Sequence, residues 1–174
     1  MREELELIKP NDSLKIEYLN MICEWKRYEE ILIPWSLNFD TTDFSLMVKR
    51  LDGISKGIGL EDGFVECSVY WIVNKSNRIL GAVDIRHRLN ENLLYRGGHI
   101  GYGVRPSERR KGYATKMLSL ALKVCETIEI PNVLITCSKN NIGSAKTIIK
   151  NGGILGSEGR VNGEVFQRYW INLR

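Results

Sequence analysis

A turn rich in basic residues and glycine, at positions 104–115, constrains the fold of this chain more than any other segment. The stretch before it, 97–104, has the character of a strand, and the residues after it repeat apolar side chains at helical spacing. Beyond Pro131, which ends that helix, the apolar run 133–137 is typical of a strand buried on both faces. The sequence therefore predicts a strand, a tight turn, a helix and a parallel strand, joined by a right-handed crossover.

The turn also has the chemistry of a phosphate site. A helix N-terminus offers N–H groups and a partial positive charge to an anion. Gly112 lets a ligand approach the backbone, and Ala114 adds little bulk. Arg109, Arg110 and Lys111 add charge, so we assign the local basic excess to a small phosphorylated cofactor. The P-loop and dinucleotide glycine spacings are absent. An ordinary basic helix start is the alternative.

The spacing Arg109-x-x-Gly112-x-Ala114 resembles the [RQ]-x-x-G-x-[GA] signature of the GNAT superfamily of N-acetyltransferases. In that family the turn holds the pyrophosphate of acetyl-CoA. The predicted order of elements is also similar: strand, two helices, three strands, helix, strand, helix, two strands. The runs 86–90 and 97–102 look like a branch of predicted acetyltransferases. The resemblance implies an α/β (α+β) fold over 1–174 as a single domain. Its mixed, mostly antiparallel central sheet would be flanked by about four helices.

The resemblance implies acetyl transfer from acetyl-CoA to a primary amine, by direct attack within a ternary complex. Backbone groups on the strand before the turn would hold the pantetheine arm and polarise the thioester carbonyl. The start of the helix at 141–150 would also meet the cofactor. The implied cofactor residues are Gly103, Val104, Arg109, Arg110, Lys111, Gly112, Tyr113, Ala114, Thr115, Asn141 and Ser144.

The acid of the reaction is not evident from the family pattern. Many members carry a tyrosine in N-x-x-A-x-x-x-Y, and here the frame gives Asn141, Ser144 and then Ile148. Either another group donates the proton or the thiolate leaves unprotonated. Tyr102 is one candidate, because strand alternation puts it on the same face as Val104. The alternative for Tyr102 is a core aromatic with a satisfied hydroxyl.

His99 is a second catalytic candidate, because an ordinary imidazole pKa of about 6.5 suits a base near neutral pH. Strand alternation places it on the face opposite Tyr102, which argues against that role unless a bulge reorients it. The other histidine, His87, lies after a predicted strand and is equally compatible with a solvated loop residue.

The sequence gives little information about the amine that accepts the acetyl group. The resemblance places its site near the first two helices and near the connection 86–96. Arg86, Arg88 and Arg96 in that connection favour an acceptor with a carboxylate or phosphate, whereas Glu91 works against this preference. The expected partner is a small-molecule amine or a peptide amine. A homodimer is also compatible with the sequence.

Composition agrees with one globular domain. The 174 residues are 43% apolar and 26% charged. No apolar run approaches the roughly 20 residues of a membrane span, and the charged start does not resemble a signal peptide. The four cysteines lack metal or redox spacing, so we expect reduced thiols, no metal and a cytoplasmic protein.

Two other functions stay open. One is a GNAT-fold module that binds acetyl-CoA without turnover, as a sensor or interaction domain, and the missing tyrosine supports it. The other is nucleic-acid binding through the basic turn. We do not expect nucleic acid as a partner, because the basic residues surround one turn instead of forming a stripe with interleaved aromatics.

Overall fold

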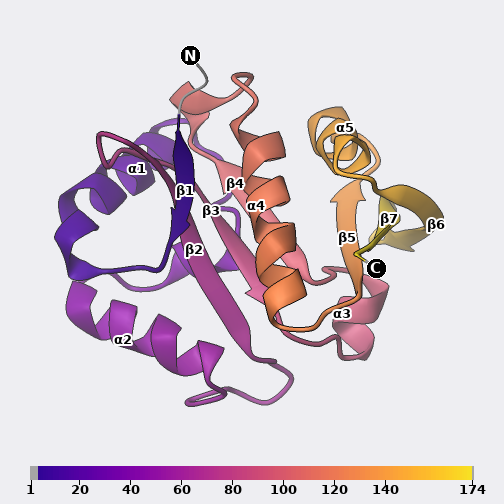
Figure 1. Ribbon diagram of the computed structural model, residues 1–174, viewed down its shortest axis with the longest axis horizontal. Coiled ribbons are helices and arrows are strands. Elements are labelled where there is room, and N and C mark those ends of the chain that lie inside the picture. Colours follow the sequence, from indigo (N-terminus) through magenta and orange to yellow (C-terminus); the bar gives the residue numbers. More distant parts are fainter. Residues whose placement is uncertain (1–3, 174) are drawn as a thin grey trace.

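The computed structural model describes residues 4–173, where seven strands form two antiparallel sheets (Figure 1). The first sheet has the order β1-β2-β3-β4, and the second has the order β5-β7-β6. The first sheet contains β1 (Leu5–Ile8), β2 (Cys67–Asn74), β3 (Ile79–Arg86) and β4 (Ile100–Val104). The second contains β5 (Asn132–Ser138), β6 (Ile154–Val161) and β7 (Glu164–Asn172).

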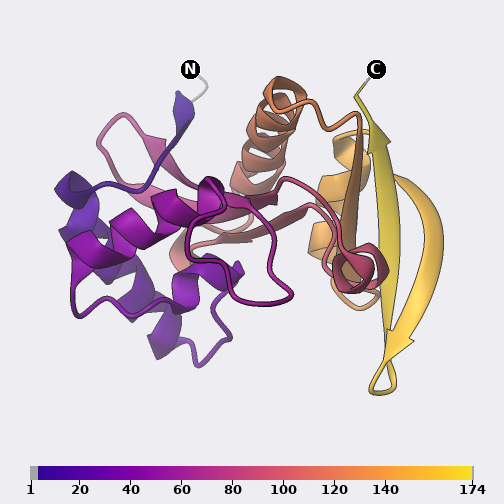
Figure 2. The same ribbon diagram turned by 90° about the horizontal axis from the view of Figure 1, so that it is seen from below.

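The helices cover both faces of the first sheet. The helices at 15–27 and 44–55 lie on one face, and the helix at 113–127 lies on the other, as the edge-on view in Figure 2 shows. The α-helices are α1 (Lys15–Arg27), α2 (Phe44–Ser55), α3 (Glu91–Tyr95), α4 (Tyr113–Thr127) and α5 (Ile142–Lys150). Short 3₁₀ helices are η1 (Asp12–Leu14), η2 (Trp35–Asn38) and η3 (Pro106–Glu108). None of the helices within 4–173 is long and apolar enough to span a membrane.

The two faces of the first sheet have separate cores. Trp71 is buried beneath α1 and α2, whereas the core beneath α4 continues to α5 and the second sheet. Val83 and Ile85 of β3 belong to the α4 core, and Ala82 belongs to the other. Because strand residues alternate between faces, Asp84 points toward α1 and α2. This alternation decides which side chains can reach each side of the site described below.

The predicted α+β class with mostly antiparallel strands is confirmed. The expected parallel pairing of 133–137 is wrong, because β5 pairs antiparallel with β7 in a separate sheet. Sequence periodicity also missed α3, whose five residues are too few to show a helical repeat.

The strand predicted at 97–104 begins only at Ile100. Gly97 and Gly98 have φ values of 123° and 67°, which take the backbone out of the extended region. Gly98 allows close approach, because a Cβ there would collide with the carbonyl of Leu134 on β5. The two glycines therefore bring the start of β4 against β5, where the two sheets meet.

Candidate functional site

The strands β4 and β5 meet at one end and then belong to different sheets, and we call the region between them the fork. The His99 N–H donates to the Leu134 carbonyl at 2.7 Å, and Gly98 forms an isolated bridge with Ile135. Beyond these residues, β4 pairs with β3 and β5 pairs with β7. The inner edges of β4 and β5 therefore face each other without a shared ladder.

The ladder with β3 shows which β4 groups face the fork. The Arg86 N–H donates to the His99 carbonyl and the Arg105 N–H donates to the Leu80 carbonyl, each at 2.8 Å. Along an antiparallel strand, residues that hydrogen-bond the neighbouring strand alternate with residues that do not. The backbone of Gly103 therefore also bonds β3, whereas the N–H and C=O groups of Val104 and Tyr102 point to the fork. Gly103 and Val104 are the two β4 residues implied for the cofactor, and of these Val104 lies at the edge that faces the fork.

Gly103 lies at the opposite edge, where its backbone serves the sheet. A Cβ on Gly103 would collide with the Ile33 carbonyl, and it would come within 2.9 Å of the Trp25 ring. The glycine is therefore needed because the chain segment after α1 crosses over β4 at this point. The small residue on this strand therefore admits another backbone.

The turn before α4, the anion seat predicted from the sequence, leaves the first N–H groups of the helix uncapped. Gly112 caps the helix at φ 88°, and a Cβ added there would find nothing within 4 Å. No side chain caps α4, whereas α2, α3 and α5 begin with the side-chain caps Asp43, Asn90 and Asn141. The first N–H groups of α4, such as those of Ala114 and Thr115, have no acceptor within the helix. The seat is thus open space in front of backbone donors.

Most basic side chains at this turn are already paired with carboxylates, unlike the sequence-based interpretation. The Arg109 Nη1 donates to Glu30 at 2.8 Å and its Nε donates to the Val104 carbonyl at 3.1 Å. The Lys111 ammonium lies 2.8 Å from Glu108. The third basic residue named at this turn, Arg110, has no ion pair with the described part of the chain. The attraction for an anion comes mainly from the backbone.

The predicted residues Tyr102 and Ser144, far apart in sequence, meet across the fork. The Tyr102 hydroxyl lies 2.9 Å from the Ser144 Oγ at the start of α5. Burial raises the pKa of Tyr102 to about 12, so the phenol keeps its proton near neutral pH. Asn141 is occupied as the cap of α5, because its Oδ1 accepts the Ser144 N–H at 3.0 Å. Ile148, at the family tyrosine position, is fully buried.

His99 lies on the face opposite Tyr102, as alternation predicts, and it holds the fork together. Its buried Nδ1 accepts the Leu134 N–H at 3.0 Å. Burial and then the charge of Arg86 lower its pKa to about 4, so the imidazole is neutral. A neutral imidazole that accepts at Nδ1 carries its proton on Nε2. The second histidine, His87, bonds the Ser68 hydroxyl at 2.8 Å.

Replacing His99 with alanine is expected to destabilise the fold by about 1–3 kcal/mol at pH 7, because the Leu134 N–H loses its buried acceptor. The unfolded imidazole titrates near pH 6.5, above the folded value. The wild-type protein therefore loses His99-dependent stability as the pH falls from about 6.5 to about 4, and the deficit of the variant shrinks. Urea unfolding of the wild-type protein and of His99→Ala at pH 7 and pH 5 checks this. A deficit that stays constant across this range would contradict it.

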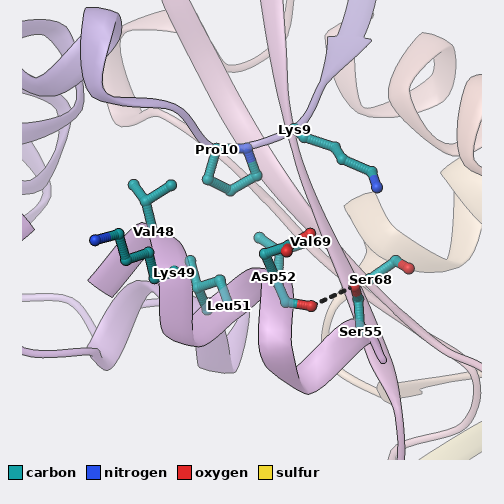
Figure 3. A pocket seen from close by; sticks show the side chains of 9 residues that line it. All are labelled: Lys9, Pro10, Val48, Lys49, Leu51, Asp52, Ser55, Ser68 and Val69. Atoms are coloured by element: carbon teal, nitrogen blue, oxygen red, sulfur yellow. Dashed lines mark hydrogen bonds between the residues drawn. The ribbon is translucent and has the colours of Figure 1, made fainter. Parts of the chain in front are cut away.

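A cavity of about 240 Å³ lies away from the fork (Figure 3). Its lining comes from the end of β1, from α2 and from β2, where the Ser55 hydroxyl donates to the Asp52 carbonyl at 2.7 Å. No residue of β4, β5 or α4 contributes to it. Within 4–173, no cluster of three or more histidine, cysteine or acidic side chains is arranged to hold a metal ion. The fork and the adjoining turn are therefore the candidate site.

Comparisons with known proteins place this arrangement in a family. The model of the acetyltransferase (GNAT) domain matches residues 4–154. A search of curated proteins found no significant match. Among solved structures, the chain is similar to the ribosomal-protein-S5-alanine acetyltransferase from Vibrio fischeri, with 15% identity and a TM-score of 0.72. That alignment covers 99% of this chain and 93% of the other.

Two further solved structures share the fold. One is the microcin C7 self-immunity acetyltransferase MccE in complex with acetyl-CoA and AMP, with 17% identity, a TM-score of 0.69, and coverage of 99% and 94%. The other is the spermidine/spermine N-acetyltransferase SpeG from Vibrio cholerae, with 13% identity, a TM-score of 0.63, and coverage of 97% and 93%. The family model includes the strand, the anion turn and the helix that the sequence singled out. With most of its length matched, this chain belongs to the GNAT family of acetyltransferases, enzymes whose acetyl donor is acetyl-CoA.

Proposed function

We propose that this chain transfers an acetyl group from acetyl-CoA to a primary amine, by direct attack while both molecules are bound. The observation that carries the proposal is the fork, which joins an open anion seat at Gly112 to the Tyr102–Ser144 pair. Similar proteins act on amines, since one is named for a ribosomal-protein alanine and another for spermidine. An amine is therefore the acceptor class best supported.

The residues at the fork fit the parts of the cofactor. The backbone donors at the start of α4, with the exposed Arg110 and Lys111 beside them, suit a pyrophosphate. The inner edge of β4 at Val104 and Tyr102 suits the amides of a pantetheine arm, since amides pair with open strand edges. On β5, across the fork, the backbone amide groups of Thr136 are placed to pair with the arm in the same way. Bound there, acetyl-CoA supplies the activated acetyl group as a thioester.

The remaining predicted residues frame the seat. Tyr113, Ala114 and Thr115 are half-buried on the first turn of α4, and Gly112 is exposed. We propose that the pyrophosphate is held by backbone groups of this turn. The Arg109 side chain, clamped by Glu30, fixes the shape of the turn.

We propose that Tyr102 donates a proton to the departing sulfur. Its phenol is protonated near neutral pH, and Ser144 orients the hydroxyl. His99 is less suited to act as a base, because its only lone pair is used by the Leu134 N–H. We propose that His99 is a positioning residue at the closed end of the fork.

Tyr102→Phe is expected to lower kcat by about 10-fold or more, with little change in the KM for acetyl-CoA. Loss of the hydroxyl removes the proton donor and leaves the backbone edge intact. Steady-state rates at saturating acetyl-CoA check this. Tyr95→Phe is the matched control, because its hydroxyl contacts the Arg160 carbonyl far from the turn. A kcat equal to that of wild type would exclude Tyr102 as the main acid.

The function itself is tested by a calorimetric titration with acetyl-CoA, with ATP and NAD as controls, followed by acetylation of an amine panel. Selective binding with turnover supports the transferase. Selective binding without turnover supports the second candidate, a non-catalytic acetyl-CoA-binding module. The observation that favours this second candidate is the fully buried Ile148 at the family tyrosine position.

A further inference from the structure

The face of the fork opposite α4 and α5 carries two arginines. On β3, Val83 and Ile85 point into the α4 core, so Arg86 points away from α4. On β7, Tyr169 and Ile171 belong to the same core, so Arg168 also points to the opposite face. Both side chains therefore reach the side from which an acceptor can approach the fork without meeting α4 or α5.

Arg86 binds backbone through one edge of its guanidinium, and we call the other edge, which has no ion-pair partner within residues 4–173, the open edge. Its Nη1 donates to the carbonyls of Gly97 and Gly98 at 3.2 and 3.0 Å. Its Nη2 lies 3.5 Å from the place where a Cβ on Gly101 would stand. Across residues 4–173, no carboxylate comes within ion-pair distance of it. The half-buried guanidinium thus keeps its Nε–Nη2 edge, the edge that binds carboxylates bidentately, without an acidic partner.

The acids near Arg86 are engaged elsewhere. Asp84, two residues away on the same face, accepts both the N–H and the hydroxyl of Ser36. Glu66 pairs with Arg88 at 2.8 Å. Of the three arginines in the connection 86–96, Arg86 is therefore the one without an ion pair in the described chain. Burial raises the pKa of Asp84 to about 6, and the charge of Arg86 opposes that rise across a longer distance. A half-buried cation is stabilised when a ligand supplies the missing anion.

Arg168 adds a second cation at the same junction. Its Nη2 donates to the Leu94 carbonyl at 2.7 Å and its Nη1 donates to the Ser157 hydroxyl at 3.1 Å. Its Nε is buried and has no hydrogen-bond partner in the described chain. Opposite Arg168 on β5, Thr136 accepts the Gly97 N–H at 3.0 Å. The two arginines therefore hold the same short segment, 94–98, from its two ends.

We propose that the acceptor is an amine that carries a carboxylate, which the open edge of Arg86 binds beside Arg168. This inference rests on the proposed function, because only an acetyltransferase has an acceptor amine. Gly101, beside the guanidinium, is one strand residue, about 3.3 Å, from Tyr102 at the open edge. The carboxylate and the amine are therefore separated by a few bonds, as in small amino acids. A polyamine, which carries only positive charge, is disfavoured at the same place.

The experiment compares matched amines that differ only in charge. Initial rates of CoA release are measured with glycine, β-alanine and γ-aminobutyrate, with their carboxamides and with spermidine. For at least one pair, we expect kcat/KM to be about 10-fold or more higher for the carboxylate than for the carboxamide. Arg86→Gln is expected to remove this difference, and Arg86→Lys to retain part of it. Arg88→Gln is the matched control and is expected to keep it, because Arg88 is exposed and already paired with Glu66.

Several results would overturn the inference. In one, the carboxamides or spermidine react as fast as the carboxylates. In another, no carboxylate in the panel is acetylated by a protein that binds acetyl-CoA. In a third, Arg86→Gln lowers the rates of both members of a pair equally, which assigns Arg86 only to holding Gly97 and Gly98. The comparison of carboxylates with carboxamides in the wild-type protein tests the inference even if a variant fails to fold. Loss of acetyl-CoA binding in wild type would instead be a failure of the proposed function.

Discussion

Replacing Gly112 with glutamate is expected to abolish acetyl-CoA binding while leaving the protein folded. The position is exposed, and a Cβ added there would meet nothing within 4 Å, so the fold has room for a side chain to begin. The carboxylate would stand in front of the α4 N–H groups, where it competes with a pyrophosphate and repels it. We expect a loss of affinity of about 100-fold or more, which corresponds to about 3 kcal/mol.

The measurement is a calorimetric titration of wild-type and variant proteins with acetyl-CoA. The chain offers a matched control, Gly152→Glu, because Gly152 also has φ 88° and open space around its Cβ position. Both variants place the same side chain on the same strained backbone, but Gly152 lies after α5. If a folded Gly112→Glu protein kept the wild-type affinity, the anion seat would lie elsewhere.

Arg105→Gln is expected to destabilise the protein by about 3–5 kcal/mol, because it removes the buried cation that pairs with Glu17 and Glu24 and leaves Glu17 only a longer contact of 3.9 Å with Arg78. Arg105 is 5% exposed and its guanidinium contacts Glu17 at 2.6 Å and Glu24 at 2.5 Å. Glu24 also accepts the Ser107 N–H, so these contacts fasten the segment before the anion turn to α1. The loss is measured by urea unfolding at pH 7.

The same contacts predict the pH dependence. Burial opposes ionisation of Glu24, but hydrogen bonds from Ser107 and Arg105 prevail and hold its pKa below the usual range. This stabilisation is present above the unfolded pKa of about 4.3 and is lost as the pH falls through the lower folded pKa. The stability that Arg105→Gln loses relative to wild type therefore becomes smaller below about pH 4. Arg50→Gln is the control, because its pair with Glu61 is exposed and is expected to contribute less than about 1 kcal/mol. Equal losses of unfolding free energy in Arg105→Gln and Arg50→Gln would show that burial of Arg105 adds no stability.

Local chemistry explains the parts of the fold that the sequence predicted. The Asn162-Gly163 pair adopts φ values of 51° and 82°, which few other residue pairs tolerate, so the last hairpin is specified by two neighbouring residues. The turn at Gly112 and the apolar face of α4 are likewise encoded within one segment. Tyr102 and His99 fall on opposite faces of β4 because strand alternation is a local rule.

Contacts between distant segments explain the parts that the sequence could not predict. The partner of Arg109 is Glu30, and the partners of Arg105 lie on α1, so no pattern within the basic turn reveals that these two arginines are paired. The fork arises where Gly98 admits the Leu134 carbonyl, which depends on how two sheets meet. The open edge of Arg86 depends on Asp84 being taken by Ser36 and Glu66 by Arg88.

The carboxylates that hold the basic turn act as built-in counterions. A nucleic acid gains affinity when basic side chains replace the small cations condensed on its phosphates. Arg105, Arg109 and Lys111 would first have to release Glu17, Glu24, Glu30 or Glu108, so this exchange gains little. A single diphosphate at the proposed site would face no such obstacle, because the peptide dipoles at the start of α4 would bind it with no partner removed. A chain with an isoelectric point near 8.9 can thus keep a seat for one small anion that a long polyanion has little reason to occupy.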